Sequence, residues 1–319
     1  MKHKILRNRI TGVLAALTVS ICSFSVKSQV NIVEDFSSDP IGTTWTFGFG
    51  DNSNSQYSWA NTAPAYTGDS NGSLTVLFDS SLPTARLQRN LGQSFDSTQS
   101  FTLSTVFSFS VVNAPNDQFM QFAFGLVDSA ATGGSRTGNF FTSTPADTFS
   151  SIEFNYFPNA TAFGGPTLQQ VAIGGEAFPG AEIFDNWALG FGAAYDVTLP
   201  QATLLQADLI FDSFSQMLDL NLYTVNGDGS LSFFASVPSV NTSALAPSFA
   251  FDSMAIMAYF DEYTTPMDPS LVGAMTFQHM SFTTPIPEPG TWLLLSVGLV
   301  CLLVCRKKFA VSAKTVAIS

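Results

Sequence analysis

The segment Phe101-Thr-Leu-Ser-Thr-Val-Phe-Ser-Phe-Ser110 decides the fold class of this chain. Its apolar side chains stand at positions 101, 103, 107 and 109, and hydroxyl side chains occupy most of the positions between them. Successive side chains of a β-strand point to opposite faces, so this spacing places one face against a core and the other in solvent. We therefore predict a strand with one buried face.

Similar segments recur along the chain, each bounded by Gly, Asn, Asp, Ser or Pro. They cover residues 73–79, 101–112, 118–128, 151–157, 204–211, 217–225, 231–237, 249–260 and 275–283. The sequence Asn226-Gly-Asp-Gly229 predicts a tight hairpin between two of them. Since no amphipathic helix and no fixed-period repeat interrupts these segments, we predict an all-β fold, an antiparallel two-sheet sandwich of the jelly-roll type.

The N-terminus has the three parts of a secretory signal peptide. Basic residues come first, an apolar stretch covers residues 10–24, and Val26-Lys-Ser28 offers a small residue at the cleavage position. We predict a signal peptide over residues 1–28 and a β-sandwich over residues 29–284. A lipoprotein anchor at Cys22 is a weaker alternative, because Ile21 stands where a small residue is needed.

The C-terminus contains the short motif Pro287-Glu-Pro-Gly290, an apolar run and a basic cluster. The apolar run covers residues 291–305 and is shorter than the ~20 residues that span a bilayer, so a buried core helix is an alternative. However, the run is apolar on all sides, as a lipid-exposed helix must be. We predict a single transmembrane helix within residues 285–308 and a short cytoplasmic tail over residues 309–319. The residues expected to stop translocation are Arg306, Lys307 and Lys308.

This order of features resembles the PEP-CTERM sorting signal of Gram-negative bacteria that make extracellular polysaccharide. The resemblance implies that a membrane-embedded processing enzyme, an exosortase, recognises the motif and removes the tail. The precursor would be anchored in the inner membrane, and the product would reach the cell surface or the extracellular space. The tail of residues 309–319 departs from the usual pattern, in which the chain ends soon after the basic cluster. The recognition residues implied by the resemblance are Pro287, Glu288, Pro289 and Gly290.

Charge and cysteine content limit the chemistry of the exported part. Between residues 29 and 290 lie all 24 acidic residues but only three of the 12 Lys and Arg residues. Such a surface disfavours nucleic acid, whose phosphates need basic side chains, and an anionic glycan would need divalent cations as a bridge. The three cysteines lie in the predicted signal peptide and anchor. The exported part therefore has no disulfide and no zinc-thiolate site.

Four segments resemble the concanavalin A-like lectin and glucanase superfamily. Legume lectins of this superfamily carry a strand of the form Val-Glu-Phe-Asp that binds a transition metal and calcium. In Ser151-Ile-Glu-Phe-Asn, Glu153 matches the Glu, and Asn155 stands in place of the Asp. The resemblance implies a calcium site at Glu153 and Asn155, weakened by the missing charge, and the alternative is a strand with two polar residues. The segments begin at residues 32, 122, 151 and 216.

An enzyme is disfavoured. Glycoside hydrolases with this fold have two or three acids in a Glu-x-Asp-x-Glu type pattern, which this chain lacks. Asp208 and Asp212 share a strand face, but they lie roughly 13 Å apart at ~3.3 Å per residue, which is too far for retaining hydrolysis. His279 is the one histidine outside the signal peptide, and a lone histidine in a strand is usually structural.

Sugar binding requires fewer specifically placed residues than catalysis does. Three tryptophans in Gly-, Asn- and Ser-rich loops are candidates for packing against sugar rings, although such rings also fill sandwich cores. Two hypotheses follow: a surface protein that associates with extracellular polysaccharide, with calcium as a conceivable cofactor, or a structural envelope or biofilm protein without a specific ligand. A glycoside hydrolase is a third, less favoured one. The candidate aromatic residues are Trp45, Trp59 and Trp187.

Overall fold

The computed structural model describes residues 29–49, 56–61, 72–79, 85–113, 120–130, 151–158, 167–173, 197–245, 249–260 and 272–285. Apart from residues 29, 30 and 285, they belong to one compact unit that runs from Asn31 to Thr284. Within the described ranges the unit consists of strands and one four-residue helix, α3 (Thr242–Leu245).

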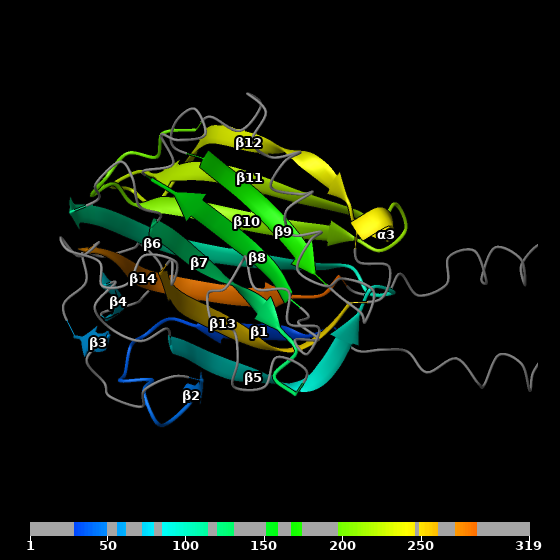
Figure 1. Cartoon of the computed structure of the whole chain (residues 1–319), viewed down its shortest axis with the longest axis horizontal. Coiled ribbons are helices and arrows are strands. Elements are labelled where there is room, and N and C mark those ends of the chain that lie inside the picture. Colours follow the sequence, from blue (N-terminus) through cyan, green and yellow to red (C-terminus); the bar gives the residue numbers. More distant parts are fainter. Residues whose placement is uncertain are drawn as a thin grey trace, which may run out of the picture. The chain divides into compact units, whose positions relative to one another are not determined.

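The strands form two antiparallel sheets that lie in layers (Figure 1). The eight-stranded sheet has the order β12-β11-β10-β6-β14-β4-β3, with β1 also paired to β14, and the six-stranded sheet has the order β2-β5-β13-β7-β8-β9. The strands are β1 (Asn31–Glu34), β2 (Thr46–Phe49), β3 (Tyr57–Ala60), β4 (Ser73–Asp79), β5 (Ala85–Asp96), β6 (Phe101–Asn113), β7 (Met120–Val127), β8 (Ser151–Phe157), β9 (Thr167–Ile173), β10 (Leu205–Asp212), β11 (Met217–Val225), β12 (Leu231–Asn241), β13 (Ala250–Phe260) and β14 (Val272–Thr283).

Alternation of apolar and polar side chains explains why these segments are strands. In β10, the residues from Leu205 to Phe211 alternate between buried and half-buried, with the apolar ones inside. The central strand β6 pairs with β10 on one side and with β14 on the other. This arrangement confirms the predicted all-β, antiparallel two-sheet sandwich.

Phenylalanine rings from both sheets fill the space between them. Phe107 of β6 contacts Phe124 of β7 and Phe154 of β8, in each case with the ring centroids 5.4 Å apart. Phe124 and Phe154 are stacked at 4.4 Å. A second group joins Phe101 of β6 to Phe251 of β13 at 5.0 Å. Burial of such rings, with about 25 cal/mol gained per Å² of apolar surface, is the main force that holds the sheets together.

The two ends of the unit lie side by side. β1 pairs with the end of β14, and Asn31 stands opposite Thr283. The first and last strands of the sandwich are therefore neighbours in one sheet. The predicted signal peptide, the predicted transmembrane helix and the predicted tail lie outside the described residues. Among the described residues, no helix is long and apolar enough to cross a membrane.

Every strand expected from the alternating pattern is found, with ends that differ by a few residues. The hairpin at residues 226–229 is also confirmed, since the Asn226 N–H donates to the carbonyl of Ser230 between β11 and β12. Five strands were not predicted. They are β1, β2, β3, β5 and β9.

Candidate functional site

Strand β8 presents Glu153 and Asn155 on the outer face of the six-stranded sheet. Phe154, between them, points inward and stacks on Phe124, so alternation directs its two neighbours away from the eight-stranded sheet. Both side chains are nevertheless buried, Glu153 completely and Asn155 with 1% exposed. A carboxylate rarely occupies such a position unless it is paired or bound, so this is the candidate site.

Small residues lie beside these two side chains. Glu153 stands opposite Gly125 of β7, and Asn155 stands opposite Ala123. One strand further on, Ala255 of β13 is opposite Gly125. Ala123 and Ala255 are fully buried. The small side chains next to Glu153 are therefore covered by other parts of the molecule.

Polar side chains of β5 border these small side chains on their other side. Gln88 is opposite Ala255, and Arg86 is two residues away on the same face. The Arg86 Nε–H donates to Gln88 Oε1 at 3.0 Å. From β5 to β8 there are three strand spacings, roughly 14 Å at ~4.8 Å each. The outer face thus carries a cationic border on β5 and an acidic border on β8, and Arg86 and Glu153 are both buried.

Gly125 is required for the close approach of β7 and β8 at this point. A Cβ atom on Gly125 would lie 2.0 Å from the carbonyl oxygen of Ile152 and 2.8 Å from the Cα of Glu153. Any other residue would push the two strands apart, because Cβ atoms do not approach backbone so closely. The position of Glu153 therefore depends on a glycine in the neighbouring strand.

The contacts of Glu153 and Asn155 bear on the predicted calcium site. The Asn155 amide donates to Glu153 Oε2 at 3.3 Å. Calcium takes six to eight oxygen ligands, and these two residues supply only part of that number. Among the described residues, no group of three or more His, Cys, Asp or Glu side chains is placed to hold a metal ion. The calcium site stays a prediction.

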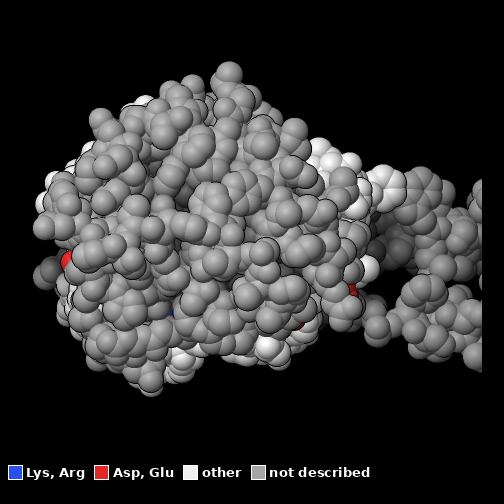
Figure 2. All heavy atoms as spheres, in the orientation of Figure 1, with Lys and Arg blue, Asp and Glu red and all other residues white. Residues whose placement is uncertain are grey.

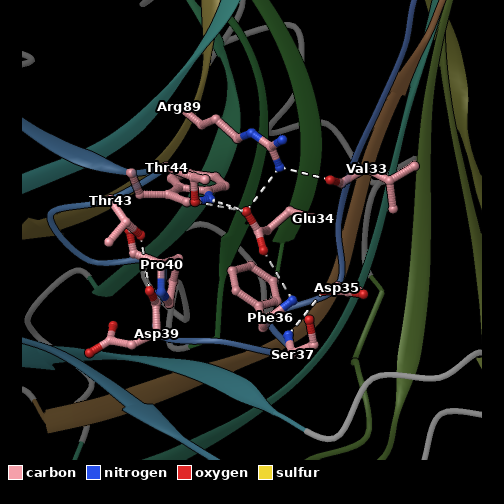
Figure 3. A network of polar contacts seen from close by, with 11 residues as sticks. Val33, Glu34, Asp35, Phe36, Ser37, Asp39, Pro40, Thr43, Thr44 and Arg89 are labelled. Carbon is pink, nitrogen blue, oxygen red and sulfur yellow. Dashed lines mark hydrogen bonds and ion pairs between the residues drawn. The ribbon is translucent and has the colours of Figure 1, made fainter.

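A second buried carboxylate, Glu34 at the end of β1, has many donors (Figure 3). The Arg89 guanidinium forms an ion pair with it at 2.9 Å, and the Trp45 indole N–H donates to it at 2.9 Å. Thr44 donates its hydroxyl at 3.2 Å, and Phe36 donates its N–H at 3.1 Å. Phe36 has φ of 53°, a conformation that ordinary residues rarely adopt, so Glu34 also stabilises this turn.

Two of the three candidate tryptophans, Trp45 and Trp59, lie within the described residues. Trp45 is fully buried and has no exposed face for a sugar ring. Trp59 in the edge strand β3 is half-buried, and its indole N–H donates to the carbonyl of Phe36 at 2.8 Å. Trp187 lies outside the described residues, as do all the sorting and stop-transfer residues.

The two arginines of β5 do not face the same side. Arg86 and Arg89 lie opposite Met257 and Met254, and so on opposite faces of β5, as their spacing suggests. Burial lowers the pKa of His279, while the carboxylates of Asp35 and Glu34 act in the opposite direction. The imidazole is therefore neutral at neutral pH. In the view of Figure 2, acidic atoms of the described residues are small isolated spots.

Sequence reasoning did not predict a group of exposed aromatic residues on the hairpin of β11 and β12. Phe233 and Phe234 are exposed, and Tyr223 packs edge-on against Phe233. Two adjacent phenylalanines in a strand cannot both face the core if the strand alternates. That adjacency is the signal that could have identified them.

Comparison with known proteins identifies the C-terminal segment. Residues 285–308 match the family model for the PEP-CTERM protein-sorting motif, which confirms the predicted sorting segment. Among curated proteins, none matches this chain. The family match covers the sorting segment and says nothing of the sandwich.

Solved structures similar to this chain include legume lectins, which have concanavalin A-like jelly-roll folds. The winged bean acidic lectin, solved with methyl-α-D-galactose, is 13% identical over 81% of this chain and 100% of its own, with a TM-score of 0.46. Lectin I from Ulex europaeus, solved with the methyl glycoside of α-L-fucose, is 10% identical over 82% and 99%, with a TM-score of 0.41. Similarity of this degree does not carry a ligand over to this chain.

Proposed function

We propose that this chain is an exported cell-envelope or extracellular-matrix protein that is sorted through residues 285–308 and associates with extracellular polysaccharide through its β-sandwich. The sorting motif is the observation that carries the proposal. A signal peptide over residues 1–28 would deliver the chain to the export machinery. A helix within residues 291–305 would hold the precursor in the inner membrane until an exosortase removes it.

The position of the motif supports this order of events. β14 ends at Thr283, and the Pro-Glu-Pro motif begins at Pro287, only a few residues later. Asn31, the first residue of β1, is paired with Thr283. Both processing sites are thus expected just outside the sheet, where cleavage would cut no strand. A sandwich that is complete between Asn31 and Thr284 can lose both ends and stay folded.

The polysaccharide part of the proposal draws on composition and on the outer face of the six-stranded sheet. The acidic body favours an uncharged glycan, or an anionic one bridged by calcium. On that face Gln88 is half-buried, whereas Glu153, Asn155 and Arg86 are buried, so Gln88 is the polar group nearest to the surface there. Trp59 and Trp187 are the tryptophans that could add ring contacts.

A purely structural envelope protein is the second candidate. The observation in its favour is that the best-defined polar cluster, around Glu34, is used entirely for internal contacts. A protein of this kind would be sorted in the same way but would bind no sugar. A glycoside hydrolase is less favoured than either.

Sorting is tested by exchanging the motif in the intact chain. Replacing Pro287, Glu288 and Pro289 together with alanine should leave an unprocessed precursor in the membrane fraction, whereas Lys314→Ala, outside the matched segment, should be processed normally. Immunoblots of membrane, surface and medium fractions measure both. Normal processing of the triple variant would contradict the sorting proposal.

Polysaccharide binding is tested separately with a glycan array, together with a melting curve recorded with and without calcium. Selective retention of a glycan supports the binding proposal, and its loss in Glu153→Gln would locate the site on the six-stranded sheet. If no glycan is retained and calcium leaves the melting temperature unchanged, the structural candidate is the better one.

A further inference from the structure

One exposed asparagine among the described residues begins a three-residue acceptor sequence for N-linked glycans. The sequence Asn241-Thr-Ser243 has the form Asn-x-Ser/Thr, in which x is not proline. Asn241 and Ser243 are exposed, and they stand where β12 ends and α3 begins. Two further sequences of this form, Asn71-Gly-Ser73 and Asn159-Ala-Thr161, begin outside the described residues. Because so short a pattern often occurs by chance, the surroundings of Asn241 decide whether it can carry a glycan.

The chain itself holds the side-chain oxygen of Asn241. The backbone N–H of Ser243 donates to this Oδ1 atom at 3.0 Å, and the Ser243 hydroxyl donates to it at 2.6 Å. A backbone N–H can only donate, so the atom that faces it must be the oxygen of the amide and not the nitrogen. The amide nitrogen, Nδ2, therefore points the other way, and within the described residues it makes no hydrogen bond. Asn241 thus presents its nitrogen, the atom that a glycan would join, to solvent.

Other asparagines differ from Asn241 in burial or in bonding. Asn155 is buried, and its amide donates to a neighbouring carboxylate. Asn226 is exposed, but its amide donates to two serine hydroxyls of the hairpin turn, at 2.9 Å and 3.0 Å. Neither of them begins an Asn-x-Ser/Thr sequence. Among the asparagines that the structure describes, Asn241 alone combines the acceptor sequence with an exposed side chain.

Thr242, the middle residue of the acceptor sequence, limits the time at which a glycan could be added. It is fully buried, and its N–H and its hydroxyl donate to the carbonyl of Gln216 at 2.9 Å and 3.1 Å. An enzyme could not draw this segment into an active site without breaking those bonds, so transfer would precede folding. The modified side chain would then fit the fold, because Asn241 keeps its oxygen and both bonds from Ser243.

We propose that Asn241 is an N-glycosylation site, with a lipid-linked oligosaccharide as the donor. Nδ2 forms a bond to the anomeric carbon of the first sugar, and the bond from that carbon to the lipid diphosphate breaks. The amide proton passes to a base of the transferase, and the lipid diphosphate is the leaving group. This site rests on the export that is part of the proposed function, because the chain has to meet the donor while it emerges unfolded from the membrane. It does not depend on polysaccharide binding by the sandwich.

The test is mass spectrometry of the full chain, isolated from the membrane and surface fractions of the organism that encodes it. Chymotrypsin cleaves after phenylalanine, so Asn241 falls in a peptide of residues 235–249, which contains neither of the other two acceptor sequences. Asn241→Gln removes the acceptor, and Asn226→Gln is the matched control at an exposed asparagine outside such a sequence. Ser243→Ala removes the hydroxyl and leaves Asn241 in place, whereas Ser243→Thr keeps the acceptor sequence.

We expect the wild-type peptide to carry the added mass of hexose or N-acetylhexosamine units. This added mass should be lost in Asn241→Gln and in Ser243→Ala, and kept in Ser243→Thr and in Asn226→Gln. An unmodified peptide from protein in the surface fraction would overturn the glycosylation site and leave the proposed sorting intact. Added mass that persists in Ser243→Ala would also overturn it, because the acceptor sequence would then not be what is recognised. A chain found unprocessed and only in the cytoplasm would overturn both the site and the proposed function.

Discussion

Phenylalanine side chains are buried between the two sheets but exposed on the β11–β12 hairpin. Phe124 is fully buried and contacts Phe107 and Phe154, whereas Phe233 has one ring neighbour within the described residues, Tyr223. The interior uses its rings to join two sheets. The hairpin presents its rings to whatever lies outside.

The comparison extends beyond the rings. The interior also contains a closed polar cluster at Glu34, a glycine whose place is set by a neighbouring strand, and a half-buried histidine, His279. The hairpin has a polar cluster at Asn226, a glycine with open space around it, and an exposed aspartate. Matched substitutions at these pairs of sites measure how differently the interior and the hairpin contribute to stability.

The largest difference is expected between Phe124→Ala and Phe233→Ala. Loss of the buried ring removes stacking on Phe154 and leaves a cavity, so the free energy of unfolding should fall by about 3–5 kcal/mol. Loss of the exposed ring should change it by less than ~0.5 kcal/mol. Urea unfolding followed by tryptophan fluorescence measures both. Equal losses would mean that the hairpin ring is part of the core.

Glu34→Ala tests whether the polar cluster around Glu34 contributes to the free energy of unfolding, as the buried phenylalanine rings do. The change leaves the Trp45 indole N–H and the Arg89 guanidinium without their shared acceptor, which should cost about 2–3 kcal/mol in urea unfolding. Asn226→Ala is the matched change on the hairpin. Because its hydrogen bonds are exposed, the cost there should stay below ~1 kcal/mol. A neutral Glu34→Ala would show that the cluster stabilises little.

A smaller effect is expected from an added methyl group. Gly125→Ala places a Cβ atom 2.0 Å from the carbonyl oxygen of Ile152, so β7 and β8 must separate, at about 1–3 kcal/mol. Gly227→Ala in the hairpin turn meets nothing within 4 Å and should be close to neutral. Melting temperatures of the two variants provide the measurement, and a neutral Gly125→Ala would contradict the close approach of the strands.

The smallest effects concern pH. Burial lowers the pKa of His279 in the folded chain below the ordinary value of 6.5. At pH values between the folded and unfolded pKa, the unfolded chain therefore binds more protons, and stability falls as the pH drops below about 6.5. His279→Gln should remove this slope from melting temperatures recorded between pH 7 and pH 5. A slope that persists in the variant would assign it to other groups.

Asp228 is the matched group on the hairpin. A hydrogen bond from the Ser230 side chain lowers the pKa of this carboxyl below 3.8, so any stability that it contributes is present above pH 3.8 and is lost as the pH falls through the lower, folded value. Asp228→Asn should leave the slope above pH 5 unchanged. A change in that range would contradict the assignment to His279.

Alternation of buried side chains made some strands easy to predict. In β8 the buried Ile152, Phe154 and Tyr156 alternate with other residues, and β8 was predicted with its observed ends. β5 was missed because its apolar residues, Leu87, Leu91 and Phe95, stand four apart, and its register against β13 shifts between Asn90 and Phe95. A β-bulge of this kind inserts an extra residue, so apolar residues on the same face are no longer two positions apart and the strand is not recognised from its alternation.

The candidate site was predicted in part. The strand that carries Glu153 and Asn155 was identified, but not that both side chains are buried or that Gly125 lies opposite one of them. Trp45 was named for its residue type, but its indole N–H donates to Glu34, which also binds Arg89, 55 residues further along the chain. Contacts between segments so distant in sequence leave no local signal.

By itself, the sequence determined the β-class, the hairpin at residues 226–229, the acidic body and the sorting segment at residues 285–308, because each is written in a local pattern of residue types. Only the tertiary structure decided which aromatic rings are core and which are surface. Burial depends on which strands become neighbours, and in this sandwich the neighbours are set by pairings such as β1 with β14 and β5 with β13, across most of the chain.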